Sequence, residues 1–198
     1  MGITLRYENG QTPLDEDEKE GLLIKSIQTQ GELNEAEQLN IEEALEWTIK
    51  RKFDLKTIAS EDFVIRLHQR MYGAVWKWAG TFRKTNKNIG VDKFQIGSAL
   101  KQLNDDAQYW IPNQTYSPDE LAIRYKHRIV NIHCFPNGNG RHSRLMADII
   151  IKNLFDAQPF SWGTHNLVKQ GDARTNYLAA IRAGDAGNFE PLLEFARS

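Results

Sequence analysis

The segment from His133 to Arg144, which reads HCFPNGNGRHSR, holds the side chains best suited to chemistry in this chain. A histidine stands at its start, arginines stand near its end, and glycines alternate with asparagines between them. Histidine can accept a proton near neutral pH, and arginine binds phosphate through paired, charge-assisted hydrogen bonds. Arg141 and Arg144 lie three residues apart, so on a helix they share one face. The segment therefore places a base beside groups that bind an anion.

The backbone around these side chains also favours an anion site. Gly138 and Gly140 permit a turn that directs successive N–H groups toward one point. The apolar run from Leu145 to Leu154 predicts a buried helix whose N-terminus, near Asn139, would add free N–H groups and the positive end of its dipole. A turn, a helix cap or a solvated pair of arginines would each explain one part alone. Their combination in one short segment favours a phosphate site.

The rest of the sequence predicts the helices that position this segment. Apolar residues recur at spacings of three and four through most of the chain, and glycine and proline are sparse there. The predicted helices span residues 14–26, 34–51, 57–76, 100–111, 117–133, 139–154, 166–182 and 188–197. Residues 79–97 are richer in glycine and asparagine and predict a loop with a small hairpin. The expected fold is an all-α helical bundle.

Composition narrows the class of protein. The 198 residues, 40% of them hydrophobic, suffice for one sizeable core, and the net charge of −1 gives no general electrostatic case for nucleic acid. No apolar run approaches the roughly 20 residues that cross a bilayer, so no membrane association is expected. The single cysteine, Cys134, cannot form an internal disulfide and is interpreted as a small apolar filler beside the histidine. A cytoplasmic protein is expected.

The sequence HCFPNGNGRHSR resembles the signature of Fic-domain proteins, His-x-Phe-x-(Asp/Glu)-Gly-Asn-Gly-Arg-x-x-Arg, at every fixed position except the acidic one. LHQRMYGAVWKWAGTFRKTNKNIG is similar to the helix and pre-flap segment of such domains, and AGDAGNFEPLLEF is similar to their closing helices. The chain also resembles a bacterial Fic subgroup known only as "mobile mystery protein B". The resemblance implies a Fic core over residues 50–198, preceded by an N-terminal helical extension over residues 1–49.

The resemblance implies a fold and an activity. Fic proteins fold as a helical bundle with a small β-hairpin flap, here about residues 86–97. Most are nucleotidyltransferases that move AMP from ATP to a Ser, Thr or Tyr hydroxyl of a target protein. ATP as substrate, Mg²⁺ as cofactor and a protein as partner are therefore expected, and a homodimer stays open.

The resemblance also implies roles for individual residues. His133 would be the general base that deprotonates the target hydroxyl. The flap would dock the target segment by strand addition. The implied nucleotide-binding residues are Asn137, Gly138, Asn139, Gly140, Arg141 and Arg144, and the implied docking residues are Ile89, Gly90 and Val91.

Asn137 departs from the family signature, which has Asp or Glu at this position. An amide oxygen can ligate Mg²⁺ but brings no charge, so the metal site at Asn137 is expected to be weak. The departure leaves three functions open. They are AMP transfer, transfer of another nucleotide or phosphate-containing group, and nucleotide binding or protein interaction without catalysis.

The sequence SIQTQG resembles the inhibitory pattern (Ser/Thr)-x-x-x-Glu-(Gly/Asn) of many Fic proteins, with Ser26 first and Gln30 in place of the glutamate. In the family, that glutamate pairs with the second arginine of the motif, here Arg144. A neutral amide would hold this arginine less tightly than a carboxylate. We hypothesise that residues 12–30 form a weakened inhibitory segment. An ordinary turn between two helices is an equal alternative, and a shifted register would bring a nearby glutamate into the same place.

Overall fold

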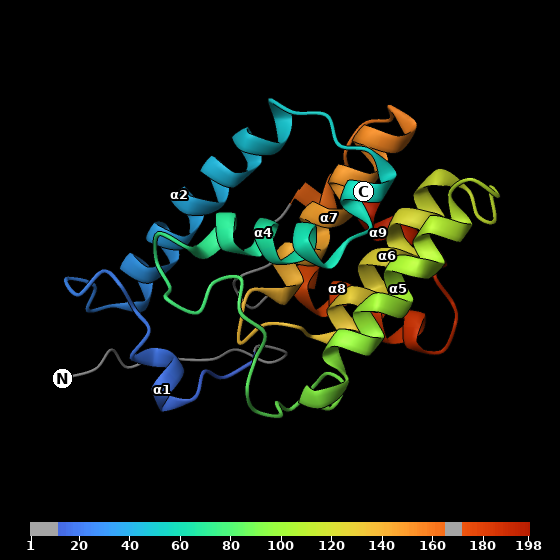
Figure 1. Ribbon diagram of the computed structural model, residues 1–198. Helices are drawn as coiled ribbons and strands as arrows, with labels where there is room; N and C mark the ends of the chain where they lie inside the picture. Colours follow the sequence, from blue (N-terminus) through green and yellow to red (C-terminus); the bar gives the residue numbers. More distant parts are fainter. Residues whose placement is uncertain (1–11, 165–171) are drawn as a thin grey trace.

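The computed structural model describes residues 12–164 and 172–198, and this part of the chain is helical (Figure 1). Its only β-pairing is an isolated antiparallel bridge between Leu22 and Trp76. The helices are α1 (Glu16–Lys19), α2 (Gln30–Ile49), α3 (Leu55–Ile58), α4 (Glu61–Tyr72), η1 (Lys93–Gln95), α5 (Ile96–Trp110), α6 (Pro118–Ile132), α7 (Asn139–Phe155), η2 (Trp162–Thr164), α8 (Asp172–Asp185) and α9 (Glu190–Arg197). The all-α prediction is confirmed.

Helices α6 and α7 form the centre of the bundle and pack against each other. Helix α5 covers the outer side of α6, while α2 lies on the other side of the molecule and packs on α4 (Figure 1). Helix α9 contacts both α8 and α6. The two central helices are consecutive in the chain, so the short loop that joins them lies at one end of the core.

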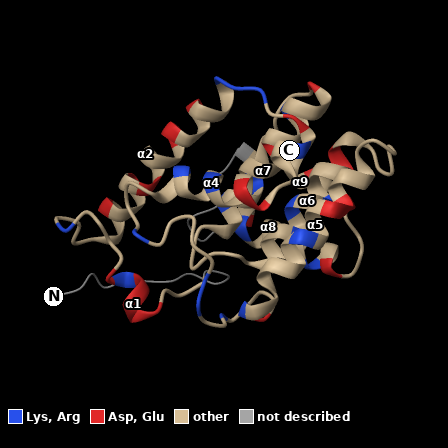
Figure 2. Cartoon of the chain, in the orientation of Figure 1, with Lys and Arg blue, Asp and Glu red and all other residues tan. Residues whose placement is uncertain are grey.

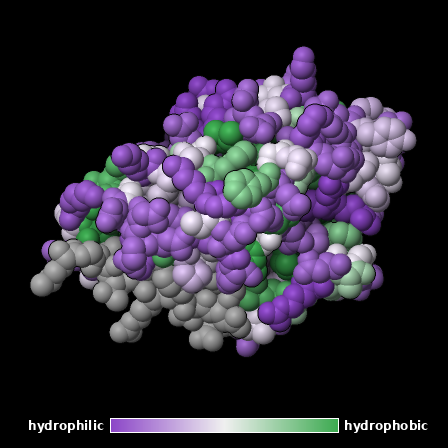
Figure 3. Space-filling view, turned by 60° about the horizontal axis from the view of Figure 1, so that its bottom comes forward, coloured by the Kyte–Doolittle hydropathy of each residue, from purple (hydrophilic) through white to green (hydrophobic). Residues whose placement is uncertain are grey.

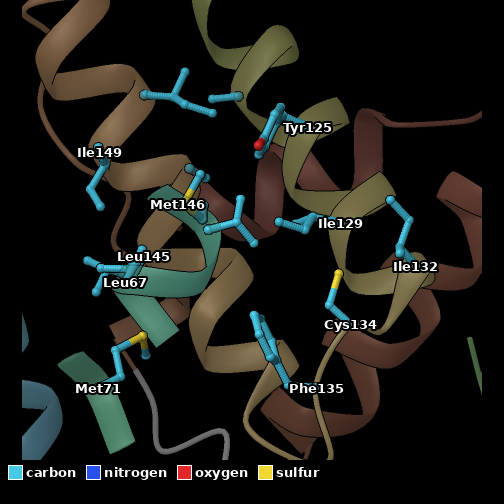
Figure 4. Close-up of a cluster of buried hydrophobic side chains, with 14 of the residues drawn as sticks. Leu67, Met71, Tyr125, Ile129, Ile132, Cys134, Phe135, Leu145, Met146 and Ile149 are labelled. Atoms are coloured by element: carbon cyan, nitrogen blue, oxygen red, sulfur yellow. The ribbon is translucent and has the colours of Figure 1, made fainter. Parts of the chain in front are cut away.

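The core is built on the apolar faces of α4, α6 and α7. Figure 4 shows the buried side chains of Leu67, Ile129 and Met146 gathered between these helices. The thiol of Cys134 points into the same cluster and is 1% exposed. Burial raises the pKa of this thiol to about 12, so it stays protonated and unreactive near neutral pH. The structure thus supports an apolar role for Cys134.

The N-terminal helices differ from their predicted boundaries. The helix predicted over residues 14–26 is reduced to α1, and the chain then turns at Gly21, where an added Cβ would lie 2.9 Å from the carbonyl oxygen of Glu18. Helix α2 begins four residues earlier than predicted. The Thr29 side chain accepts a hydrogen bond from the Glu32 N–H, and the Glu32 carboxylate returns one to Thr29, which together form a capping box.

The β-hairpin predicted within residues 86–97 is not formed, and the segment consists of turns, η1 and the first turn of α5. Side chains take the backbone groups that a strand partner would use. Arg83 donates to the carbonyl oxygens of Thr85 and Val91, and the Asn86 side chain accepts from the Lys93 N–H. The backbone is therefore satisfied without a ladder.

One face of the molecule is largely polar (Figure 3). Asp and Glu residues gather on α1 and along α2 (Figure 2). Hydrophilic residues cover most of the face in Figure 3, with small hydrophobic areas between them. Across the described helices, none combines the length and apolar character needed to span a membrane.

Candidate active site

The loop between α6 and α7 carries the motif HCFPNGNGRHSR. The side chain of Asn139 holds this loop together by hydrogen bonds. His133 ends α6 in a left-handed conformation (φ 57°, ψ 61°), and Gly138 begins α7 with φ 78°. The Asn139 side chain spans the loop: its Oδ1 accepts from the Phe135 N–H at 3.0 Å, and its Nδ2 donates to the Phe135 carbonyl oxygen at 2.8 Å. Asn139 is 4% exposed, so its side chain holds the loop while its backbone lies at the N-terminus of α7.

His68 of α4 supports the loop from below. Its ring stacks on Phe135 at 3.7 Å between centroids. Its Nδ1 accepts from the Gly80 N–H at 3.0 Å, so Nε2 carries the proton and donates to the carbonyl oxygen of Asn137 at 3.0 Å. Burial holds the pKa of His68 well below its usual value, so the ring is neutral. Sequence reasoning missed this residue, and its only signal was a polar aromatic on the apolar face of a helix.

The two glycines at the start of α7 have different surroundings. An added Cβ at Gly138 would lie 2.6 Å from the ring of Tyr72, and its positive φ is also unfavourable for other residues. An added Cβ at Gly140 would meet nothing within 4 Å. Gly138 is thus required by packing, while Gly140 leaves open space beside the arginines.

His133 is buried, with 4% of its surface exposed. Burial and the charge of Arg83 lower its pKa to about 4, so the ring is neutral near pH 7 and can accept a proton. Arg83 also fixes the backbone here, because its Nε donates to the His133 carbonyl oxygen at 2.7 Å. The Thr12 Oγ1 lies 3.0 Å from Nε2 of His133. A hydroxyl group therefore already lies at the nitrogen expected to act as base.

The two arginines of the motif are held differently. Arg141 forms an ion pair with Glu37 of α2, with Nη1 and Oε2 2.7 Å apart, and its guanidinium lies over the ring of Tyr72 at 5.1 Å. Arg144 lies over the ring of Tyr177 at 5.5 Å. In the described part of the chain no carboxylate pairs with Arg144. Arg144 is therefore available to an anion, whereas Arg141 is already partly neutralised.

These groups surround one cavity of about 530 Å³, a volume that suits a nucleotide. Arg174 and Arg182 of α8 also line it, and sequence reasoning did not find them because α8 lies far along the chain from the motif. The sequence-derived site residues that line the cavity are Gln30, Ile89, Gly90, His133, Asn137, Gly138, Asn139, Gly140, Arg141 and Arg144.

The remaining sequence-derived residues lie nearby or apart. Val91 does not line the cavity, but its N–H donates to the Ile132 carbonyl oxygen at 3.4 Å. Ser26 is exposed and lies outside the lining. The Gln30 side chain donates to Asn34 Oδ1 at 2.9 Å, and no hydrogen bond joins it to Arg144 in the described part of the chain. The acidic residue that reaches a motif arginine is Glu37.

The side chains of the cavity do not form a magnesium site of their own. Asn137 Oδ1 accepts from the Gly138 N–H at 2.6 Å, and Asn137 Nδ2 donates to the Thr12 carbonyl oxygen at 3.0 Å. Of the carboxylates in the lining, Glu37 pairs with Arg141, and Asp185 accepts from His127 and Asn131. Within residues 12–164 and 172–198, no three His, Cys, Asp or Glu side chains are grouped as metal ligands.

The fold and the cavity define an all-α domain whose central helix-loop-helix presents a neutral histidine and two arginines to one pocket. Residues 58–151 match the family model described as the Fic/DOC family. The chain therefore contains a Fic domain.

Known proteins share this domain. Protein adenylyltransferase fic-1 of Caenorhabditis elegans is 25% identical over 144 residues, which cover 69% of this chain and 26% of that protein. The chain thus spans about a quarter of the length of this curated relative. A solved fragment of C. elegans Fic-1 matches 88% of this chain and 51% of that chain, with a TM-score of 0.65 and 21% identity. BepC of Bartonella tribocorum, solved with bound AMPPNP, matches 92% and 97% of the two chains, with a TM-score of 0.67 and 18% identity.

Proposed function

We propose that this chain is a protein adenylyltransferase that moves AMP from ATP to a Ser, Thr or Tyr hydroxyl of a target protein. The observation that carries the proposal is that His133, Arg141 and Arg144 line the same cavity. The relative in C. elegans, named a protein adenylyltransferase, and the AMPPNP bound to BepC support the same activity.

ATP would bind through its phosphates. Arg144 would take the γ-phosphate, because no carboxylate in the described residues forms an ion pair with its guanidinium. Arg141 would help hold the inner phosphates, and the backbone N–H groups at Gly138, Asn139 and Gly140 would add donors at the positive end of α7. Catalysis of this kind depends mainly on positioning and charge neutralisation.

His133 would act as general base. Its neutral ring takes the proton of the target hydroxyl at Nε2 while the hydroxyl oxygen forms a bond to the α-phosphorus. The bond between the α-phosphorus and the bridging oxygen of the β-phosphate breaks, and pyrophosphate leaves with that oxygen. Nδ1 must carry the resting proton in this tautomer.

The target segment would dock along Ile89, Gly90 and Val91 by main-chain contacts. Gly90 lies directly against the base, because a Cβ added there would be 2.7 Å from His133 Cβ. Arg83 ties the Val91 and His133 carbonyl oxygens together. A peptide on residues 89–91 would thereby bring its hydroxyl next to Nε2.

Several expectations stay proposals within this function. Mg²⁺ would bind chiefly through the phosphates of the nucleotide, with Asn137 offering one neutral oxygen. On the same basis we propose that residues 1–49 form an extension and residues 50–198 form the core. We also propose that the protein is bacterial and cytoplasmic. The inhibitory role of Ser26 and Gln30 also stays a proposal, and unchanged ATP binding in both Gln30→Glu and Gln30→Ala would remove it.

The test uses ATP labelled in the α-phosphate, with the full chain beside His133→Ala and candidate target proteins from a cell lysate. Label should appear on protein only with the unchanged chain. ATP labelled in the γ-phosphate should give none. Equal labelling by both chains would contradict the proposal.

Asn137 supports two other functions, because it lacks the charge of the family's carboxylate. Transfer of another nucleotide or phosphate-containing group would appear when GTP or UTP competes with ATP for binding and labels protein in its place. A module that binds nucleotide without catalysis would bind ATP tightly and form no labelled product.

A further inference from the structure

The chain's own N-terminal segment occupies the place next to the base. Thr12 is 6% exposed and lines the cavity together with Ile89, Gly90 and His133. Its Oγ1 lies 3.0 Å from Nε2 of His133. Besides Thr12, the described lining offers one other hydroxyl, that of Tyr177, which lies beside Arg144 and forms no hydrogen bond to His133. Thr12 is therefore the hydroxyl placed for proton transfer.

The backbone of Thr12 is fixed by the residue that departs from the family signature. Asn137 Nδ2 donates to the Thr12 carbonyl oxygen at 3.0 Å. The Oδ1 of the same amide accepts a hydrogen bond from the Gly138 N–H at 2.6 Å, so Nδ2 is the atom that faces Thr12. A carboxylate at position 137 would turn an oxygen toward this carbonyl and lose the hydrogen bond. The amide of Asn137 can thus hold the Thr12 backbone beside His133, which a carboxylate could not do.

Residues after Thr12 attach the segment to the loop proposed for target docking. Asp15 Oδ2 accepts from Thr85 Oγ1 at 2.6 Å and from Lys87 Nζ at 2.8 Å. These bonds lower the pKa of the Asp15 carboxyl. Lys87 also pairs with Glu18 at 2.6 Å, and only 4% of its side chain is exposed. The segment is therefore held at Thr12, beside the base His133, and again at Asp15 and Glu18.

We propose that Thr12 is a modification site, and that the chain transfers AMP to its own Thr12 hydroxyl within one molecule. This proposal rests on the proposed adenylyltransferase function and names one acceptor for it. His133 Nε2 takes the Thr12 proton, Thr12 Oγ1 bonds to the α-phosphorus of ATP, and pyrophosphate leaves. Each chain can carry one such AMP, and the modified residue would occupy the place that an external target needs.

The experiment incubates the full chain with ATP and Mg²⁺ and maps the AMP by mass spectrometry of the intact protein and its peptides. AMP should appear on Thr12 in the unchanged chain and on the serine of Thr12→Ser. Thr12→Ala should carry no AMP at this position. In the unchanged chain, the labelled fraction should grow at a rate independent of protein concentration. Asp15→Asn weakens the attachment to Lys87 without touching the cavity and should slow the labelling several-fold.

A mixture tests whether transfer stays within one molecule. His133→Ala keeps the acceptor and Thr12→Ala keeps the base, so AMP on Thr12 of the former would overturn the intramolecular proposal. Thermal melting and ATP binding show whether both variants are folded. Pyrophosphate release or labelling elsewhere that depends on His133, with Thr12 unmodified, would overturn the proposal and leave the adenylyltransferase function standing. If no nucleotide gave pyrophosphate release or labelled protein, both the Thr12 proposal and the adenylyltransferase function would be ruled out.

Discussion

Glu37 and Arg141 form an ion pair across 104 positions of sequence, with Oε2 and Nη1 2.7 Å apart. Glu37 is 7% exposed and also accepts from Trp76 Nε1 at 2.7 Å. Helix α2 therefore delivers a carboxylate to an arginine expected to hold phosphate. An incoming ATP must share or displace this carboxylate before Arg141 can contribute its full charge.

Glu37→Gln should strengthen ATP binding by about tenfold, equivalent to ~1.4 kcal/mol, because the amide keeps the Trp76 hydrogen bond but releases the charge of Arg141. The free energy of unfolding should fall by about 1–3 kcal/mol, since a partly buried arginine loses its partner. Calorimetric titration with ATP and urea unfolding measure the two effects. Glu35→Gln, an exposed position on the same helix, is the control. Weaker ATP binding in Glu37→Gln would contradict the expectation.

The two glycines at the start of α7 should respond in opposite ways. Gly140→Leu should fold normally, because open space surrounds the new side chain, yet it should abolish ATP binding by filling the cavity. Gly138→Ala should lower the free energy of unfolding by roughly 1–3 kcal/mol, through its positive φ and the close approach of Tyr72. Circular dichroism melts and ATP titration separate these effects. Normal ATP affinity in Gly140→Leu would show that ATP lies elsewhere.

The part of the site that could be predicted from sequence is the part encoded locally. His133, Arg141 and Arg144 meet because one short loop joins the end of α6 to the start of α7, and helix geometry then sets the spacing of the arginines. Thr12 and Glu37 could not be assigned, since 121 positions separate Thr12 from His133 and the contact depends on how the whole chain packs. Patterns of charge and hydropathy along the sequence do not specify which distant residues come into contact.

The failed hairpin prediction has a local cause. Short alternation of Val91, Phe94 and Ile96 indicated a strand, but Phe94 is 86% exposed while Ile96 is buried at the start of α5. The Asp92 side chain accepts from the Phe94 N–H and begins η1, so a capping interaction replaces strand pairing. Asp92 could have been recognised as a helix start because aspartate favours that position.

Acid should destabilise the protein through its buried neutral histidines. The pKa of His133 and of His142 is about 4, against about 6.5 when exposed, so between these values the unfolded chain binds more protons. Stability is fully present above pH 6.5 and is lost as the pH falls toward 4, by up to about 1.4 kcal/mol per pH unit for each ring. Urea unfolding from pH 7 to 4.5 measures the slope. His142→Gln should have a smaller slope, and an unchanged slope would contradict the burial argument.

The pH dependence of transfer should report the same ring. Because the pKa of His133 is about 4, the base stays unprotonated at neutral pH, and transfer should be lost only as the pH falls toward 4. The initial rate of AMP transfer, measured over short times at saturating ATP, gives this profile. His142→Gln serves as the control, since His142 does not line the cavity and its ring bonds the Val64 carbonyl oxygen. An acid limb near 6.5 would show that His133 is solvated during the reaction.

Asn137→Asp should exchange one contact for another. The carboxylate loses the hydrogen bond to the Thr12 carbonyl oxygen and repels it, so the segment at Thr12 should open and its amides exchange hydrogen faster. The new charge should also make ATP binding depend more steeply on Mg²⁺, by about tenfold between metal-free and saturated conditions, because carboxylates bind this ion better than amides do. Hydrogen exchange and ATP titration with and without Mg²⁺ measure both changes. Asn188→Asp, on the distant turn before α9, is the matched control. Unchanged exchange at Thr12 would show that other contacts hold the segment.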